Sequence, residues 1–374
     1  MGGAWLGRLP DVRDHLGLSS SALGTILLVG AFSGLASMQL APVLLRRFGH
    51  RAVLGVLATV YPLTFLAVPA ASSALALGAA LVLTQGVGSL VGVVVNTHAV
   101  DVEKAYERSI LSSFHAMFSI GMMIGAGVAG LLASKGVGVL GSIGGAAAVY
   151  FVLVSCTISR LLRVAHANPH KVDASIDHLA HHHHRKSWWK GVVLLGSLCF
   201  VAYMAEGAVA DWSSIFMREF RGAASGPAVA AFVSFSACMT VGRLSGDWLA
   251  MRLGKVTLIR SGALLASVGL VSGLLIPNIL ATIVGFAFVG IGLSVLVPVL
   301  FSIAGSMSGG ESNAAVTRVS TIAFFGLLVG PSFIGFVADH ASLTWALTIP
   351  AVLLVYVFAA STLLHGVVKK TAAI

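Results

Sequence analysis

The sequence contains very few charged residues. Only 10% of its 374 residues are charged, whereas 57% are hydrophobic. A soluble globular chain has roughly 25% charged residues. This shortage excludes an ordinary water-soluble domain and predicts a membrane protein.

Several motifs are also missing, and each absence removes a class of function. The three cysteines, Cys156, Cys199 and Cys238, have neither CxxC nor zinc-finger spacing, so no disulfide framework or metal site is expected. The chain has no nucleotide-binding P-loop and no GxSxG motif. Its apolar segments contain no nucleophile–base pair or metal-ligand constellation. We therefore expect no enzyme, no ATP-driven motor and no cofactor.

Long apolar stretches, by contrast, fill most of the chain. A transmembrane helix needs about 20 mostly apolar residues, and eleven such spans follow a short N-terminal remainder. The predicted spans are 20–45, 52–70, 73–98, 110–134, 137–161, 191–217, 226–250, 255–276, 278–304, 314–338 and 343–366. The expected fold is an all-α multi-pass membrane protein.

The net charge of +10 is unevenly distributed between the predicted loops. If the RRFGHR loop (46–51) faces the cytoplasm, the alternation of spans places most Lys and Arg residues, and the C-terminus, on that side. The exceptions are Arg8, Arg13, Lys135, Arg218 and Arg221. This is the positive-inside pattern, so the excess charge predicts orientation. It does not require a nucleic-acid partner.

A polar segment divides the spans into two groups of similar length. Residues 162–190 form the longest polar interval and are predicted to be a cytoplasmic linker between halves 1–161 and 191–374. A shift of 205 residues across this linker aligns GMMIGAGVAG (121–130) with GLLVGPSFIG (326–335). The same shift aligns RFG with RLG. A shared offset indicates a duplicated six-helix unit, which many transporter folds contain.

The repeat has a consequence for the N-terminus. The offset places Glu206 on Met1, so residues 1–9 correspond only to the outer part of a first helix. At ~1.5 Å per residue they are too short to cross a membrane. We expect eleven full transmembrane helices plus a stub, with a truncated or misassigned start favoured over a real loss of half a helix.

Two six-helix halves joined by a basic loop resemble the major facilitator superfamily over essentially the whole chain. In that family the turn between helices two and three reads roughly G-x-x-x-D-R-x-G-x-R. Arg47, Gly49 and Arg51 match this motif, whereas Pro42 and Arg46 replace its first glycine and its aspartate. The resemblance implies that the matching residues act in gating.

Two further sequence segments make the resemblance more specific. Residues 96–121 and 205–214 are similar to an uncharacterised bacterial inner-membrane branch near the fucose permeases. The resemblance implies alternating access around a midplane site, driven by an ion gradient, usually of protons. Gly330 and Pro331, in GLLVGP, look like an antiporter motif that relatives carry in the fifth helix.

Glu206 is a carboxylate close to the centre of span 191–217. Inserting an ionised group there costs on the order of 2.5–3.5 kcal/mol, so it needs compensation. Cys199, Tyr203 and Ser213 share its helical face, which we expect to line a central cavity. Glu206 is predicted to bind a proton or the substrate, with a structural bond to a neighbouring helix as the alternative.

The neighbouring pair Asp211 and Trp212 is interpreted differently. Asp211 lies roughly 140° around the helix from Glu206, so the two carboxylates do not form a dyad. We expect both residues near the outer membrane surface, as boundary residues.

Other polar residues inside the spans complete the predicted site. Gln85, Ser89 and Asn96 form a stripe along the fourth helix that is a candidate cavity wall. His115 in the fifth helix titrates near neutral pH and is predicted to share proton handling with Glu206, or else to be a hydrogen-bonding strut. Arg243 and Asp247, close to the cytoplasmic end of the eighth helix, have the spacing of an intrahelical ion pair.

These features favour a proton-coupled secondary transporter of a small organic solute, acting as a monomer in the bacterial inner membrane. The amide and hydroxyl groups of the stripe suggest a sugar or polyol. Efflux of amphipathic compounds and a transport-inactive membrane scaffold or sensor are the alternatives.

Overall fold

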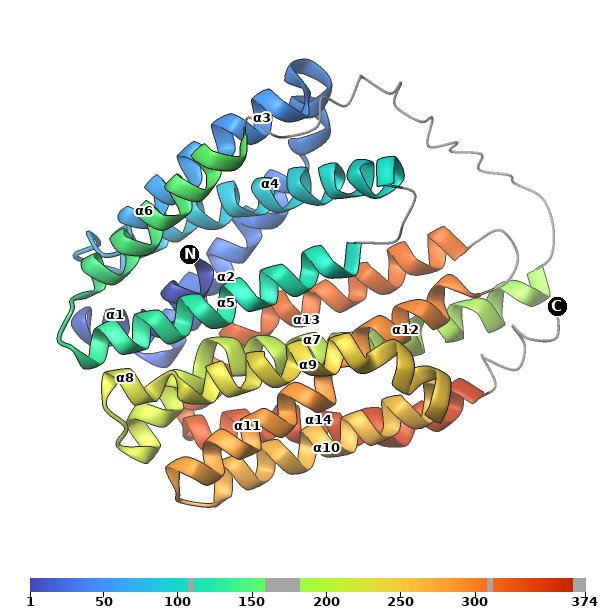
Figure 1. Cartoon of the computed structure of the whole chain (residues 1–374). Helices are drawn as coiled ribbons and strands as arrows, with labels where there is room; N and C mark the ends of the chain where they lie inside the picture. Colours follow the sequence, from blue (N-terminus) through green and yellow to red (C-terminus); the bar gives the residue numbers. More distant parts are fainter. Residues whose placement is uncertain (107–110, 159–181, 308–311, 366–374) are drawn as a thin grey trace.

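A computed structural model describes residues 1–106, 111–158, 182–307 and 312–365, and these residues form helices and short connections (Figure 1). The first group of helices is α1 (Gly2–His15), α2 (Ser20–Met38), α3 (Ala41–Leu66), α4 (Ala74–Tyr106), α5 (Leu111–Ser134) and α6 (Val139–Thr157). The second group is α7 (His182–Arg221), α8 (Ser225–Ala228), α9 (Ala230–Leu253), α10 (Lys255–Leu275), α11 (Ile279–Ser294), α12 (Leu296–Gly305), α13 (Ser312–His340) and α14 (Leu343–Ala360). A 3₁₀ turn, Ser361–Leu363, follows α14.

The helices are long and apolar enough to confirm an all-α membrane fold. Among the described residues, ten helical segments meet the length and hydropathy expected of a membrane span, and Arg51–Leu66 is a shorter apolar helix that corresponds to the predicted span 52–70. Most of the predicted linker 162–190 lies outside the described residues, so the division of the chain there stays a prediction.

Short polar side chains begin several helices. Ser19, Asn278 and Ser342 each accept a hydrogen bond from the backbone N–H three residues further on, at the starts of α2, α11 and α14. This capping satisfies a backbone donor that has no partner inside the helix.

Two predicted spans are divided where the sequence suggested continuous helices. Span 20–45 stops at Met38, and the chain restarts as α3. Span 278–304 becomes α11 and α12, which meet at Val295. Pro298 explains the second break, because its ring nitrogen has no hydrogen to donate to the carbonyl four residues earlier.

Glycines with positive φ repeat along the chain at the predicted offset of 205 residues. Gly17 and Gly222 have φ angles of 58° and 63°, and Gly49 and Gly254 have φ angles of 75° and 78°. Residues that carry a Cβ rarely adopt this backbone conformation, so glycine is favoured at all four turns. The agreement in backbone geometry supports the predicted duplication.

The two groups of helices pack against each other mainly through α2 with α13 and α5 with α9, and smaller contacts join α5 to α8 and α1 to α7. These helices run through the middle of the molecule with α7, while α3 and α6 flank them on one side and α10, α11 and α14 on the other (Figure 1). Of the apolar window in α7, 67% is buried, against 17% in α6. Helix α7 is therefore part of the core, whereas α6 is peripheral.

Candidate functional site

Glu206 and Arg243 form an ion pair near the middle of the bundle. The Arg243 Nη2 atom donates to Glu206 Oε1 at 3.1 Å, which joins α9 to α7. Arg243 Nη1 also donates to Ser119 Oγ of α5 at 3.4 Å. The three side chains are called the central triad below. Because α5 belongs to the first group of helices, the triad links the two groups at mid-depth.

The predicted partner of Arg243 was wrong. Asp247 is exposed, and among the described residues Arg243 forms its ion pair with Glu206 instead. Arg243 also lies near the middle of α9 and not close to its end. A guanidinium inside the bundle gains more from the half-buried Glu206 carboxylate than from the exposed one on its own helix.

Tyr203 lies one turn before Glu206 on α7, as the helical spacing predicts. Its ring stacks on Phe324 of α13, with centroids 5.7 Å apart and an angle of 15° between the ring planes. Tyr203 is half-buried. The ring pair gives the surroundings of the central triad a flat apolar surface.

The polar stripe of α4 faces α2. Gln85 Cγ would lie 3.2 Å from a Cβ at Gly30, and Ser89 Oγ would lie 2.5 Å from a Cβ at Gly34, so both side chains pack on glycines of α2. Asn96 is exposed. Whether the stripe lines a solute pathway stays a prediction. His115 belongs to α5, but its side chain lies outside the described part of the structure.

Asp211 and Trp212 do not have the environment expected of boundary residues. Trp212 is fully buried, its ring contacts Gly335 of α13, and its indole N–H has no hydrogen-bond partner within the described residues. Asp211 is half-buried and forms no hydrogen bond or ion pair with the described residues. Their depth in the membrane stays a prediction, and Trp212 shows that an amphipathic ring is equally suited to a core position where two helices pack closely.

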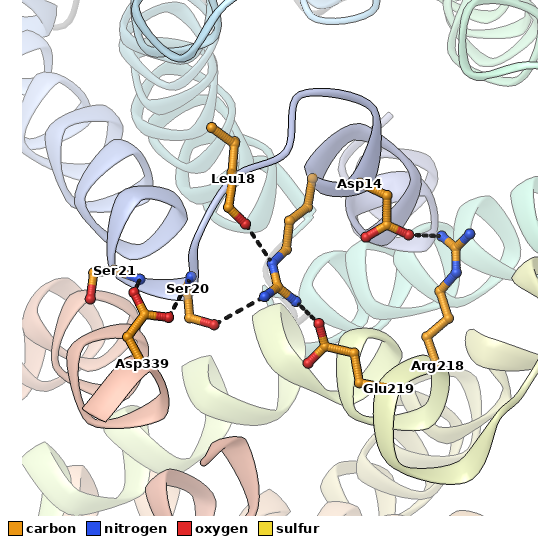
Figure 2. A network of polar contacts seen from close by, with 8 residues as sticks. Asp14, Leu18, Ser20, Ser21, Arg218, Glu219 and Asp339 are labelled. Carbon is orange, nitrogen blue, oxygen red and sulfur yellow. Dashed lines mark hydrogen bonds and ion pairs between the residues drawn. The ribbon is translucent and has the colours of Figure 1, made fainter. Parts of the chain in front are cut away.

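One end of the bundle carries reciprocal ion pairs between the two groups of helices. Arg13 of α1 pairs with Glu219 of α7, and Arg218 of α7 pairs with Asp14 of α1 at 3.4 Å (Figure 2). Arg13 also donates to the carbonyl of Leu18 at 3.1 Å. We call Arg13, Asp14, Arg218 and Glu219 the clamp, and their end of the bundle the clamp end.

Asp11 adds a second carboxylate of α1 beside the clamp. Its carboxylate lies 2.6 Å from Arg218 Nη1 and 2.8 Å from Nε of Arg8, which is buried. Asp11 therefore receives an arginine from each group of helices. A cavity of about 220 Å³ lies beside the clamp, lined by Pro10, Ile215 and the clamp residues.

A carboxylate of α13 caps α2 at the same end. Asp339 accepts hydrogen bonds from the backbone N–H groups of Ser20 and Ser21, each at 2.8 Å (Figure 2). These N–H groups are at the positive end of the α2 dipole, where a carboxylate is favourable. The cap therefore ties the first group to the second.

Close backbone packing accompanies these polar contacts. A Cβ at Gly24 of α2 would lie 2.7 Å from the Pro331 carbonyl oxygen, which is too close, so only glycine allows this approach. Gly335 of α13 likewise packs against the carbonyl of Ser20. Gly330 instead faces Met204 of α7. Gly330 and Pro331 thus serve helix packing in α13, and a gating role stays a prediction.

The opposite end of the bundle, the basic end, carries the family-like turn. Gly49 interrupts α3 with φ 75° and ψ 160°, a conformation outside the helical region. Arg47 lies over the Phe48 ring at 5.3 Å, and Arg51 is exposed. Gly49 is thus the turn residue that the motif predicts, while the roles of the two arginines stay predictions.

Sequence reasoning missed the clamp, although a signal was present. Arg13 and Asp14 align with Arg218 and Glu219 at the offset of 205 residues. Applied to charged residues as well as to glycines, the offset would have shown that both halves carry the same basic–acidic dipeptide. Their position near the ends of helices made them look like ordinary boundary charges.

Comparison with known proteins identifies the family. Residues 6–279 match the family model described as Major Facilitator Superfamily. The chain belongs to the Major Facilitator Superfamily. An uncharacterised transporter of this type from Yersinia pestis is 34% identical over 362 residues, which cover 96% of this chain and 90% of the relative. The membrane protein MosC of Rhizobium meliloti is 27% identical over 348 residues, covering 92% and 82%.

Solved structures of the same superfamily share the fold. The nucleoside transporter NupG aligns with a TM-score of 0.73 at 13% identity, over 98% of this chain and 95% of NupG. A bacterial homologue of the human lysosomal transporter Spinster, in an inward-facing and unoccupied conformation, also gives a TM-score of 0.73 at 13% identity, over 99% and 94%. The superfamily resemblance is thus confirmed, and nearness to the fucose permeases stays a prediction.

Proposed function

We propose that this protein is a proton-coupled secondary transporter that moves a small organic solute across the bacterial inner membrane by alternating access. The observation that carries the proposal is the central triad. It places a titratable carboxylate, Glu206, beside a permanently charged arginine, at mid-depth and between the two halves. Polar and ionisable residues inside membrane spans typically mark solute or proton pathways.

The distribution of contacts supports a two-state mechanism. The clamp, the Asp339 cap and the Gly24–Pro331 approach all join the halves at the clamp end. The basic end carries the arginines that the positive-inside rule assigns to the cytoplasm. In this proposal, the described conformation is a carrier closed toward the outside, with a cytoplasmic C-terminus. Opening the outside requires the clamp to break.

The chemistry of the pair supports proton coupling. An arginine stays protonated at any physiological pH, whereas a carboxylate can take up a proton. A proton on Glu206 removes the negative charge that holds Arg243, so Arg243 becomes free for another partner. Protonation thus changes one of the contacts between α7 and α9 and, through Ser119, one between the halves.

The polar side chains of α4 suggest the class of substrate. The amide and hydroxyl groups of Gln85, Ser89 and Asn96 favour a polar solute such as a sugar or polyol. Efflux of an amphipathic compound is the alternative direction. The protein is proposed to act as a monomer.

Alternating access can be tested without knowing the solute. The native cysteines are first replaced, and spin labels are attached at two repeat-related pairs of exposed positions. These are His15→Cys with Phe220→Cys at the clamp end, and Phe48→Cys with Leu253→Cys at the basic end. Distances are measured by pulsed electron paramagnetic resonance in lipid nanodiscs at acidic and neutral pH.

We expect each pair to show two distance populations, with the clamp-end pair lengthening as the basic-end pair shortens. The Glu206→Gln variant should keep both populations but lose their dependence on pH. One fixed distance in each pair under all conditions, with solutes present or absent, would instead indicate a transport-inactive scaffold.

A further inference from the structure

The guanidinium of Arg243 has more donor capacity than its contacts with the described residues use. Arginine carries five N–H donors, and the described contacts use Nη2 for Glu206 and Nη1 for Ser119. The Arg243 side chain is 34% exposed, although the residue lies near the middle of α9 and bonds to side chains of α5 and α7. The cation is thus partly exposed at mid-depth.

Charge balance determines what can bind there. With Glu206 ionised, the pair is neutral overall and compensates the cost of placing Arg243 in the membrane. When Glu206 takes up a proton, the arginine charge remains and has no counterion in the triad, since Ser119 is neutral. An unpaired charge in a membrane interior is strongly unfavourable. An anion at this position would restore the balance.

We propose that the transported solute carries one carboxylate group, which replaces Glu206 as the partner of Arg243. This proposal rests on the proposed function and names its substrate class. A carboxylate fits the planar guanidinium, because two parallel N–H groups can donate to its two oxygens. A proton on Glu206 and a monoanion on Arg243 enter together, so each transport cycle moves no net charge.

The surroundings of the pair are compatible with an organic acid. Within the described residues, the charged or titratable groups that interact with Glu206 are Arg243 of α9 and Tyr203 of α7. Helix α5 contributes the neutral Ser119, and α13 contributes the Phe324 ring stacked on Tyr203. The side chain of His115 of α5 is not among those that the structure describes. Phenol, hydroxyl and aromatic groups can hold the carbon chain of a small acid. The triad contains one cation, which matches a monoanion better than a dianion.

Two polyhydroxy compounds of equal chain length test the role of the carboxylate. Gluconate and sorbitol differ at one end of the molecule, a carboxylate against a hydroxymethyl group, and lactate and benzoate extend the series of monocarboxylates. The full chain is reconstituted in proteoliposomes, and each labelled compound is supplied with and without an inward proton gradient. Ligand-induced thermal stabilisation of the purified protein gives a second readout.

We expect a monocarboxylate from this series, and not sorbitol, to be taken up with the proton gradient and to stabilise the protein. Uptake should not change when a membrane potential is imposed. Arg243→Gln should weaken the apparent affinity by roughly tenfold or more, because a charge-assisted pair is lost. Arg243→Lys should retain part of it. Arg252→Gln is the matched control, since Arg252 lies on the same helix but stacks on Trp248.

The outcomes separate this proposal from the proposed function. Proton-driven uptake of sorbitol without uptake of any monocarboxylate overturns the carboxylate proposal and leaves a proton-coupled transporter. Stabilisation by a monocarboxylate that persists in Arg243→Gln also overturns it. Failure of all four compounds in a protein whose spin labels still switch counts against the carboxylate alone. Spin labels that never switch count against transport itself.

Discussion

Arg13 and Arg218 are related by the offset of 205 residues, and each pairs with a carboxylate of the other group of helices. Arg13 contacts Glu219, and Arg218 contacts Asp14, so the clamp is built from one dipeptide pattern used twice. A duplicated unit related by a two-fold axis produces such reciprocal contacts whenever a basic and an acidic residue lie near that axis. Breaking one pair leaves the other in place.

We expect Arg13→Glu to shift the protein toward the state that is open at the clamp end. The substitution replaces an attraction to Glu219 by a repulsion, and the ratio of the two spin-label populations should change by roughly threefold or more. The double variant Arg13→Glu with Glu219→Arg should return the ratio toward wild type. Lys135→Glu makes the same charge change at the clamp end outside the clamp and should have little effect.

Equal shifts in Arg13→Glu and Lys135→Glu would mean that the total charge of the clamp end, and not the pairing, sets the balance. High salt provides a further check. Ion pairs with exposed partners are screened by salt, so the effect of Arg13→Glu should become smaller as ionic strength rises.

The Asp339 cap should be worth about 1 kcal/mol to the α2–α13 contact, a typical value for a helix cap. Asp339→Asn removes the charge and one of the two acceptors that serve Ser20 and Ser21. Hydrogen exchange at the start of α2 should become faster. Ser134→Ala is the control at the repeat-related position, because the Ser134 hydroxyl bonds to Leu131 within its own helix. Similar exchange in both variants would contradict the role of the cap.

The sequence allowed the helices to be predicted well, because a membrane span needs a long apolar run and little else. The turn at Gly49 and its counterpart at Gly254 were also predictable, since two copies of one motif carried glycine at the same offset. Helix breaks were harder to locate. The end of α2 at Met38 lies inside an apolar stretch whose composition does not mark it.

Contacts between helices could not be predicted to the same extent. Arg243 has a suitable partner four residues away in Asp247, but the packing of α7 beside α9 offers Glu206, and local spacing contains no information about that choice. Trp212 shows the same limit, since its burial against Gly335 depends on how closely α13 approaches. Glu206 was recognisable because a carboxylate at the centre of an apolar helix is costly anywhere.

Gly49→Ala should destabilise the protein by about 1–3 kcal/mol, because the backbone at φ 75° and ψ 160° is almost restricted to glycine. Gly55→Ala is the control in the same helix. A Cβ at Gly55 would meet only Ile158, at an ordinary contact distance of 3.5 Å, and alanine favours the helix. Thermal unfolding in detergent should separate the two variants. If they unfold at the same temperature, the turn is not under conformational constraint.

The final prediction concerns the energetics of the central pair. Arg243→Gln leaves the Glu206 carboxylate without its counterion, whereas Glu206→Gln with Arg243→Gln removes both charges. We expect the single arginine variant to lose about 1–2 kcal/mol and the double variant to recover most of that loss. The loss is smaller than the 3–5 kcal/mol of fully buried pairs, because the Arg243 and Glu206 side chains are 34% and 25% exposed.

The loss of stability in Arg243→Gln should depend on pH. Protonation neutralises the carboxylate that has lost its partner, so the stability difference between the variant and wild type should shrink as pH falls. Thermal unfolding across a pH series measures this directly. Asp211→Asn is the comparison on the same helix: Asp211 makes no ion pair with the described residues, so removing its charge breaks none. If Asp211→Asn is as destabilising as Arg243→Gln, the stabilising electrostatic contact of α7 lies at Asp211 and not in the central triad.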